Sequence, residues 1–156
     1  MTTDLSPLIR ALTRDEADLA AQVHRQALDA RLPWLAGLHT PEEDRGFYRD
    51  HLHPRCRMAG LFEAGRLQGV IVFADGWIEQ LHVLPDAQGR GFGSALLEVA
   101  QRQCDVLQLW TFQRNLPARR FYENRGFVAL RETDGAENEE REPDVLYQWR
   151  RQSGAG

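Results

Sequence analysis

The apolar residues of this chain recur with two different periods, which divide it into helices and strands. Helical spacing follows Thr13, where apolar residues repeat every three or four positions up to about Ala30. Thr13 and Thr40 each stand three positions before a glutamate, which is the capping-box pattern of a helix start. Pro54 should close the helix that Thr40 opens. The pattern predicts helices over residues 13–30, 40–51, 92–100 and 115–126, with a loop over 32–39.

Apolar runs bounded by turn residues predict the strands. The pairs Ala64-Gly65 and Asp75-Gly76 are hairpin signals that join the first three of them. Gly126 follows the last helix in the manner of a C-cap, and the next strand starts directly after it. The predicted strands cover residues 57–63, 67–74, 77–84, 105–111, 127–131 and 145–149, and a polar loop rich in acid covers 133–144.

The order of these elements indicates the fold class. Two helices precede three strands joined by hairpins, and a helix, a strand, a helix and two strands follow. Antiparallel strands flanked by helices predict an α+β fold with three layers, α/β/α. At 156 residues the chain is expected to form a single domain over 1–156, with a core over about 8–149 and a frayed tail over 150–156.

Composition narrows the classes of function. The net charge of −4 argues against general nucleic-acid binding. Two cysteines, Cys56 and Cys104, form neither a disulfide framework nor a metal-ligand spacing, so no metal is expected. The sequence shows no signal peptide and no long apolar run, which predicts a cytoplasmic protein that does not enter a membrane.

The strongest chemical signal lies in residues 80–100. An apolar strand ends in a turn, the glycines Gly89, Gly91 and Gly93 follow, and a helix begins at once. A helix start has unpaired backbone N–H groups and the positive end of the helix dipole. Glycines there allow phosphate groups to approach the backbone, because no Cβ intervenes. The stretch therefore predicts a pyrophosphate-binding turn.

Two common phosphate-binding motifs do not fit this turn. A Walker loop ends in Gly-Lys-Ser/Thr, and the chain contains no lysine. A Rossmann fingerprint needs a third glycine three positions after the second, where this chain has Ser94 or Leu96, depending on the register. An acidic residue about 20 positions further on is also missing, because Thr111 and its neighbours are neutral.

A third motif does fit. The run Gln88-Gly89-Arg90-Gly91-Phe92-Gly93 resembles the acetyl-CoA signature Gln/Arg-x-x-Gly-x-Gly/Ala of the GNAT superfamily of N-acetyltransferases. Residues 115–127 resemble the second common motif of that family, Asn-x-x-Ala-x-x-Phe-Tyr-x-x-x-Gly-Phe. The resemblance extends over residues 8–149. It implies the GNAT fold, a mixed, mostly antiparallel twisted sheet of about six to seven strands flanked by about four helices. Residues 135–147 are similar to a bacterial subgroup without a clear substrate.

The resemblance implies acetyl-CoA as co-substrate. The strand before the turn should be bulged or splayed, so that its free backbone groups pair with the pantetheine arm and hold the thioester oxygen. The side chains of Leu81 and Val83 are then ordinary core, and that of His82 is packed or at the surface. The cofactor-binding residues implied in this way are Leu81, His82, Val83, Gln88, Gly89, Arg90, Gly91, Phe92, Gly93, Ser94 and Asn115. Arg90 should neutralise phosphate charge, and Asn115 is equally well explained as a helix N-cap.

Two side chains are candidate catalytic residues. Tyr122 matches the family tyrosine that protonates the departing CoA thiolate, and the alternative is a core tyrosine. Glu79 is the candidate general base for an amine that is mostly protonated at neutral pH. We expect Glu79 to share a strand face with Trp77, Leu81 and Val83. A solvated strand carboxylate, with water alone as the base, is the alternative for Glu79.

The resemblance thus implies an N-acetyltransferase that moves the acetyl group of acetyl-CoA directly to a primary amine in a ternary complex. The amine is either a small cationic one or one on a peptide or protein. The alternative is a non-catalytic acyl-CoA-binding sensor of the same fold, and a homodimer is suggested by analogy alone. In this family the loops over 32–39 and 133–144 usually border the acceptor site. An acidic border would attract a cation. In this chain the two loops contain Trp34, His39, Asp134, Glu137, Asn138, Glu139, Glu140, Arg141, Glu142 and Asp144.

Overall fold

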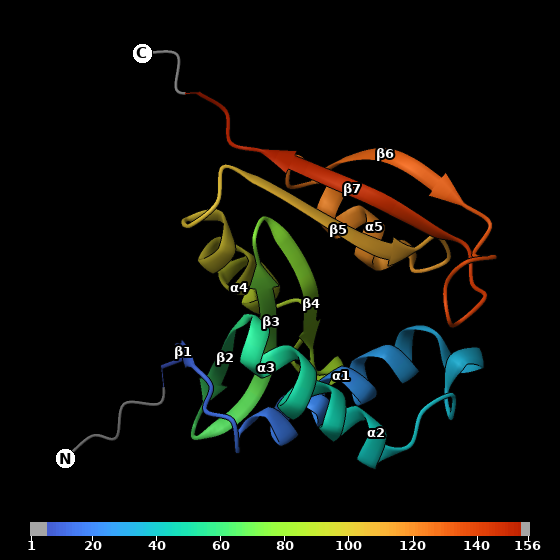
Figure 1. Ribbon diagram of the computed structural model, residues 1–156. Coiled ribbons are helices and arrows are strands. Elements are labelled where there is room, and N and C mark those ends of the chain that lie inside the picture. The colour runs from blue at the N-terminus through green and yellow to red at the C-terminus, as the bar shows by residue number, and fades with distance from the viewer. Residues whose placement is uncertain (1–5, 154–156) are drawn as a thin grey trace.

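A computed structural model describes residues 6–153 and shows a seven-stranded sheet with helices on both faces (Figure 1). The strands are β1 (Leu8–Ala11), β2 (Arg57–Glu63), β3 (Arg66–Ala74), β4 (Trp77–Val83), β5 (Val106–Phe112), β6 (Val128–Thr133) and β7 (Asp144–Arg150). The helices are α1 (Ala17–Arg31), α2 (Pro41–Gly46), α3 (His53–Arg55), α4 (Phe92–Gln101) and α5 (Leu116–Glu123). Short helical turns cover Pro33–Leu35, Phe47–Leu52 and Pro85–Ala87. The predicted α+β class with three layers is confirmed.

The sheet opens between its two halves. Its strand order is β1-β2-β3-β4-β5-β7-β6, and β4 and β5 are its parallel neighbours. These two strands pair where Trp77 faces Gln108 and then diverge, as Figure 1 shows. β5 instead pairs with β7 along its whole length. Backbone groups of β4 beyond Trp77 therefore face the opening, as the predicted splay requires.

Each face of the sheet carries its own core. Alternate residues of β3 point to opposite faces, as strand geometry demands. Val70 and Val72 pack with α1 and the buried Tyr48, whereas Ile71 and Phe73 pack with α4 and Tyr122 of α5. The two helices that the motifs predicted, α4 and α5, thus lie on the same face and meet beside the opening.

Local signals predicted several boundaries correctly. Both capping boxes form, since Thr13 and Thr40 each accept a hydrogen bond from the backbone N–H of the glutamate three positions later and donate their own backbone N–H to its carboxylate. α1 itself begins at Ala17, four positions after Thr13. Ala64 with Gly65, and Asp75 with Gly76, have positive φ in pairs, which is the geometry of tight hairpin turns.

The prediction differs from the structure at three places: the first strand, the end of the second helix at Pro54, and the start of the C-terminal tail. The edge strand β1 was missed, because its four residues are too few and too exposed to show a period. Pro54 does not end the second helical segment but lies inside α3, after a π turn over Phe47–Leu52 whose wider bonding suits a residue without an N–H. Arg150, assigned to the tail, ends β7, and Arg151 bonds Asp105. Residues 154–156 of the predicted tail lie outside the described residues.

Within residues 6–153 every helix is too short or too polar to cross a lipid bilayer.

Candidate functional site

The glycine turn presents open backbone at the start of α4. Gly89 and Gly91 have φ values of +80° and +83°, which other residues rarely adopt. A Cβ built on either glycine would meet nothing within 4 Å, so the space before them is free. Gly91 is the N-cap of α4, and the helix start behind it has amide groups without helical partners. This turn can receive an anion.

A cavity of about 280 Å³ lies in front of this turn, between the ends of β4 and α5 and the last turns of α1. Most of the predicted cofactor-binding residues line it: Leu81, His82, Val83, Gln88, Gly89, Gly91, Phe92, Gly93, Ser94 and Asn115. Positions from two separate motifs and from the preceding strand are thus brought to one surface. We call this space the cofactor cavity.

Arg90 is the exception among the predicted residues. Its guanidinium pairs with the Glu63 carboxylate at 2.5 Å and lies 4.6 Å above the ring of Phe92. It does not line the cofactor cavity. In this structure an acid on the neighbouring strand β2 holds the guanidinium, and the expected role of Arg90 in neutralising phosphate charge stays a prediction.

Two arginines that the motifs did not indicate take that place. Arg125 donates to the Ser94 hydroxyl and to the Phe121 carbonyl, and its guanidinium stacks 3.8 Å from the Phe121 ring centre. Arg31 donates to the side-chain oxygen of Gln88, whose amide nitrogen bonds the Val83 carbonyl at 3.0 Å. Both arginines line the cofactor cavity, and in the described part of the chain neither pairs with a carboxylate. The sequence carried no signal for them, since their role depends on contacts between distant elements.

A second cavity of about 300 Å³ adjoins the first. It is bordered by α1, the loop after it, the bulged part of β4, the end of β5 and one residue of the β6–β7 loop. The two cavities share Leu28, Leu81, His82, Asn115, Ala118 and Tyr122. We call the second one the acceptor cavity, because the loop over 32–39, which was expected to border the acceptor site, contributes Leu35, Leu38 and His39 to its lining.

Tyr122 lies at the junction of the two cavities. Only 7% of it is exposed, and its ring packs edge-on against Phe121 and Phe127. Burial raises the pKa of its phenol, so the hydroxyl keeps its proton at neutral pH. Within residues 6–153 this hydroxyl has no hydrogen-bond partner. It is therefore a proton donor that the fold leaves free to bind a ligand.

Asn115 also borders both cavities, and its side chain accepts a hydrogen bond from the Ala118 amide at 3.3 Å. Its expected N-cap role is confirmed. A contact with the cofactor stays a prediction.

Glu79 is the extra residue of a β-bulge in β4. Gln80 pairs with Val72 and Ile78 pairs with Phe73, which leaves Glu79 between two ladder positions. The bulge reverses the alternation, so that Ile78, rather than Glu79, joins Leu81 in the core beneath α4. The expectation that Glu79 shares a face with Leu81 was wrong for this reason. The carboxylate of Glu79 is exposed and borders the acceptor cavity.

Two neutral imidazoles form part of the acceptor cavity. His24 bonds the hydroxyl of the buried Tyr48 at 2.8 Å, and its ring lies 4.6 Å from that of His82. Burial lowers the pKa of His24 to about 4, with help from the charge of Arg25, and lowers the pKa of His82 well below its usual value. His82 packs on the α1 face and bonds Gln80 at 2.7 Å, which confirms the expectation of a packed histidine.

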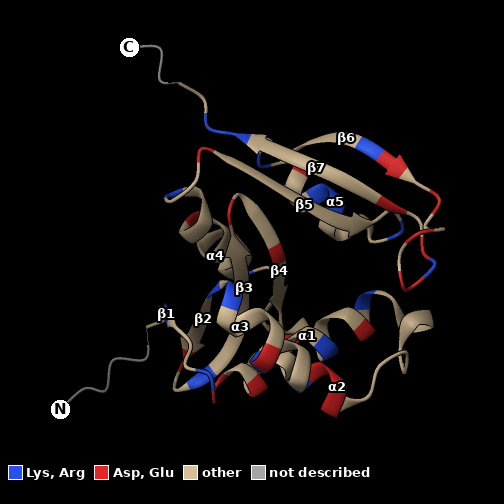
Figure 2. Ribbon diagram, viewed as in Figure 1, with Lys and Arg blue, Asp and Glu red and all other residues tan. Residues whose placement is uncertain are grey.

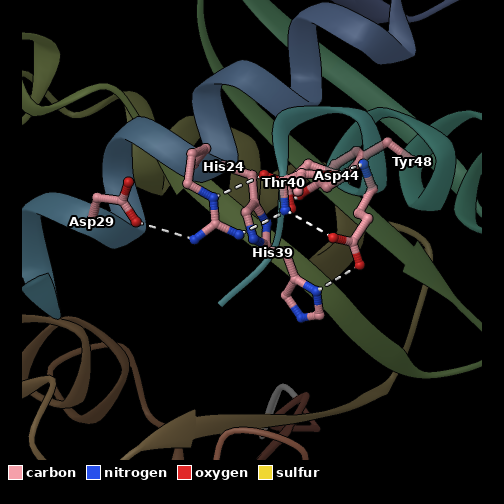
Figure 3. A network of polar contacts seen from close by, with 8 residues as sticks. His24, Asp29, His39, Thr40, Asp44 and Tyr48 are labelled. Carbon is pink, nitrogen blue, oxygen red and sulfur yellow. Dashed lines mark hydrogen bonds and ion pairs between the residues drawn. The ribbon is translucent and has the colours of Figure 1, made fainter. Parts of the chain in front are cut away.

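Beside these rings, Arg25 is held by two carboxylates (Figure 3). Its nearest contacts are 2.8 Å to Asp44 and 3.1 Å to Asp29. The positive charge of Arg25 is therefore already balanced at the border of the acceptor cavity.

The loops that border the acceptor cavity are tied together. Trp34 donates from its indole to Glu142 at 2.9 Å, and Arg114 donates to the same carboxylate at 2.7 and 2.8 Å. Arg114 also stacks 4.0 Å from the ring of Trp34. These contacts lower the pKa of Glu142, with the Arg114 hydrogen bond as the main cause. Figure 2 shows acidic residues in the β6–β7 loop. Of the residues predicted to border the acceptor site, His39 and Glu140 line the acceptor cavity, and Glu142 serves as a structural tie.

His39 makes the second tie, at 3.3 Å from Glu139 and 3.6 Å from Glu43. The ligand atoms of His39, Glu139 and Glu140 lie within 4.8 Å of one another, which is a grouping of metal-binding chemistry in the described part of the chain. Two of its three members are already paired with each other.

Comparison with known proteins agrees with this geometry. The profile of the acetyltransferase (GNAT) family matches residues 23–127. A peptidyl-lysine N-acetyltransferase of Escherichia coli K12, YiaC, is 36% identical over 66 residues, which are 42% of this chain and 45% of that protein. The matched region thus spans less than half of the curated relative.

Solved structures share the fold at low sequence identity. YjaB of Escherichia coli in its apo form has a TM-score of 0.78 at 18% identity, over 94% of this chain and 99% of that one. The PaiA N-acetyltransferase of Thermoplasma acidophilum, in complex with coenzyme A, has a TM-score of 0.68 at 18% sequence identity, over 93% of this chain and 99% of that one. YncA of Salmonella typhimurium, with acetyl-CoA, has a TM-score of 0.70 at 18% sequence identity, over 97% of each chain.

Proposed function

Because the chain belongs to the acetyltransferase (GNAT) family, we propose that it transfers the acetyl group of acetyl-CoA directly to a primary amine. The observation that carries this proposal is the junction of two cavities at Tyr122. One cavity has a phosphate-binding turn, and the other has a free carboxylate. A transferase that holds both substrates at once needs this arrangement.

The cofactor cavity suits acetyl-CoA. The amides at Gly91 and the start of α4 would bind the pyrophosphate, and Arg31 and Arg125 would balance its charge. The free backbone groups of β4 beyond the bulge would pair with the pantetheine arm. This fit rests on the empty space before the glycines and on two arginines without carboxylate partners.

Bound acetyl-CoA supplies an activated thioester, and the protein supplies the proton transfers. Glu79 would take a proton from the acceptor amine, directly or through water. A backbone N–H of β4 would stabilise the negative charge that develops on the carbonyl oxygen. Tyr122 would donate its proton to the leaving thiolate, for which its raised pKa keeps it protonated.

Direct transfer is also supported by the positions of the cysteines. Neither Cys56 nor Cys104 borders either cavity, so neither is placed to carry the acetyl group as a covalent intermediate. The name of the curated relative points to lysine side chains as one class of acceptor.

Calorimetric titration with acetyl-CoA, followed by thiol-release assays with amines, tests the proposal. Gly91→Glu puts a carboxylate into the phosphate-binding turn and should abolish binding. Gly65→Glu is the matched control, because Gly65 has a similar φ of +77° and open surroundings in the β2–β3 hairpin. Binding without turnover of any amine would favour a sensor over a transferase, and no binding by the folded wild type would refute both.

A further inference from the structure

The acceptor cavity contains few uncompensated charges. Arg25 is balanced by Asp44 and Asp29, and the two imidazoles are neutral near pH 7 because burial lowers their pKa values. Among residues 6–153, Glu79 and Glu140 have no ion-pair or hydrogen-bond partner, although both border this cavity. They come from different elements, the bulge of β4 and the β6–β7 loop.

The other acids near Glu140 have structural partners. Glu139 pairs with His39, and Glu142, whose side chain is 5% exposed, is bonded by Trp34 and Arg114. Asp144 accepts hydrogen bonds from Thr133 and Asn138. The loop is thus anchored on both sides of Glu140, while the carboxylate of Glu140 itself is left available.

The backbone next to Glu140 is strained. Arg141 has a φ of +52°, in the left-handed region that residues with a Cβ rarely adopt. This turn directs Glu142 into its buried contacts and leaves Glu140 at the cavity.

Apolar side chains also border the space that contains the two free carboxylates. Leu35, Leu38 and Trp110 line the acceptor cavity together with Glu79 and Glu140. A ligand with a cation at each end and an aliphatic chain between them matches such walls in charge and polarity.

We propose that Glu140 binds a second cationic group of the acceptor, so that the preferred acceptor is an amine with a further positive charge on its aliphatic chain. The proposal rests on the proposed function and extends it. Glu79 faces the nitrogen that is acetylated, and Glu140, from another element that borders the same cavity, determines specificity. Free diamines and lysine side chains next to a basic residue share this chemistry.

The experiment compares pairs of acceptors that differ only in the second charge. Acetyl-CoA turnover is measured with cadaverine against pentylamine, and with a capped Lys-Arg dipeptide against a capped Lys-Gln dipeptide. The variants are Glu140→Gln and, as a matched control, Glu137→Gln. Glu137 is an exposed acid of the same loop that does not border the acceptor cavity.

The wild type should favour the dication of at least one pair by about tenfold in kcat/KM, the size of one partly desolvated ion pair. Glu140→Gln should remove most of this preference, and Glu137→Gln should keep it within about twofold. The pair that shows the preference identifies the source of the second charge. An equal loss in both variants, or no preference in a wild type that turns over monoamines, would overturn the inference alone. No turnover of any amine would overturn the proposed function as well.

Discussion

Arg125 joins the end of α5 to the first turn of α4 by donating two hydrogen bonds, of 2.6 and 2.8 Å, to the hydroxyl of Ser94. The two residues are 31 positions apart: Ser94 directly follows the first motif, and Arg125 lies within the second. The Ser94 oxygen positions the guanidinium without neutralising it. A full positive charge is therefore held beside the phosphate-binding turn.

Arg125→Gln should weaken acetyl-CoA binding about tenfold or more, because charge-assisted hydrogen bonds to phosphate are among the strongest that proteins form. Calorimetry with acetyl-CoA measures the change. Arg120→Gln is the matched control, since Arg120 is exposed on α5, five positions before Arg125, and does not border the cofactor cavity. Similar affinities for the two variants would show that Arg125 only packs α5 against α4.

Tyr122→Phe should lower kcat about a hundredfold or more while the affinity for acetyl-CoA stays within about twofold. Its stability should change little, because the hydroxyl has no partner among residues 6–153. Steady-state kinetics, calorimetry and urea unfolding test these three expectations. Unchanged kcat in a folded variant would remove Tyr122 from the reaction.

His24 should make stability depend on pH. The pKa of its imidazole is about 4 in the folded protein, against 6.5 as the usual value. Between these values the unfolded chain binds the proton and the folded chain does not, so stability is lost as the pH falls from about 6.5 to about 4. Protonation of this imidazole lowers the free energy of unfolding by about 3 kcal/mol over this pH range.

Urea unfolding of the wild type and of His24→Gln, measured from neutral pH down to about pH 4, isolates this contribution. The variant should be less stable at neutral pH, since the bond to Tyr48 is altered, but its stability should fall less steeply with acid. Parallel curves for the two proteins would show that the pKa of His24 is the same in the folded and unfolded states.

Glu142→Gln should destabilise the protein by about 1–3 kcal/mol, because it removes the charge that Arg114 contacts and places an amide opposite a donor. The pKa of Glu142 is lowered in the folded state, so its contribution is complete above the usual value of 4.5 and is lost as the pH falls through the folded pKa. The difference in the free energy of unfolding between Glu142→Gln and the wild type should therefore become smaller at acidic pH.

Urea unfolding at neutral pH and near pH 4 measures this difference, and Glu137→Gln should stay within about 0.5 kcal/mol of the wild type. A variant as stable as the wild type would mean that the tie between Trp34, Glu142 and Arg114 does not contribute to folding.

Features that depend on neighbours in the chain could be predicted from the sequence. The capping boxes, the hairpin turns and the glycine turn before α4 all formed, since each needs only residues within a few positions of one another. Two such local motifs, in the right order, were sufficient to indicate the family, and ten of the eleven predicted cofactor-binding residues border the cofactor cavity.

Only the tertiary structure decided how individual side chains are used. It directed Arg90 to Glu63 and brought Arg31 and Arg125 to the cofactor cavity in its place. It also bulged β4 at Glu79, and it paired Glu142 with Arg114 while Glu140 stayed free. The physical reason is that the strength of an ion pair depends on the distance between the two charges in space, and that a bulge depends on the pairing of a strand with its neighbour. Neither is encoded in the spacing of residues along one segment.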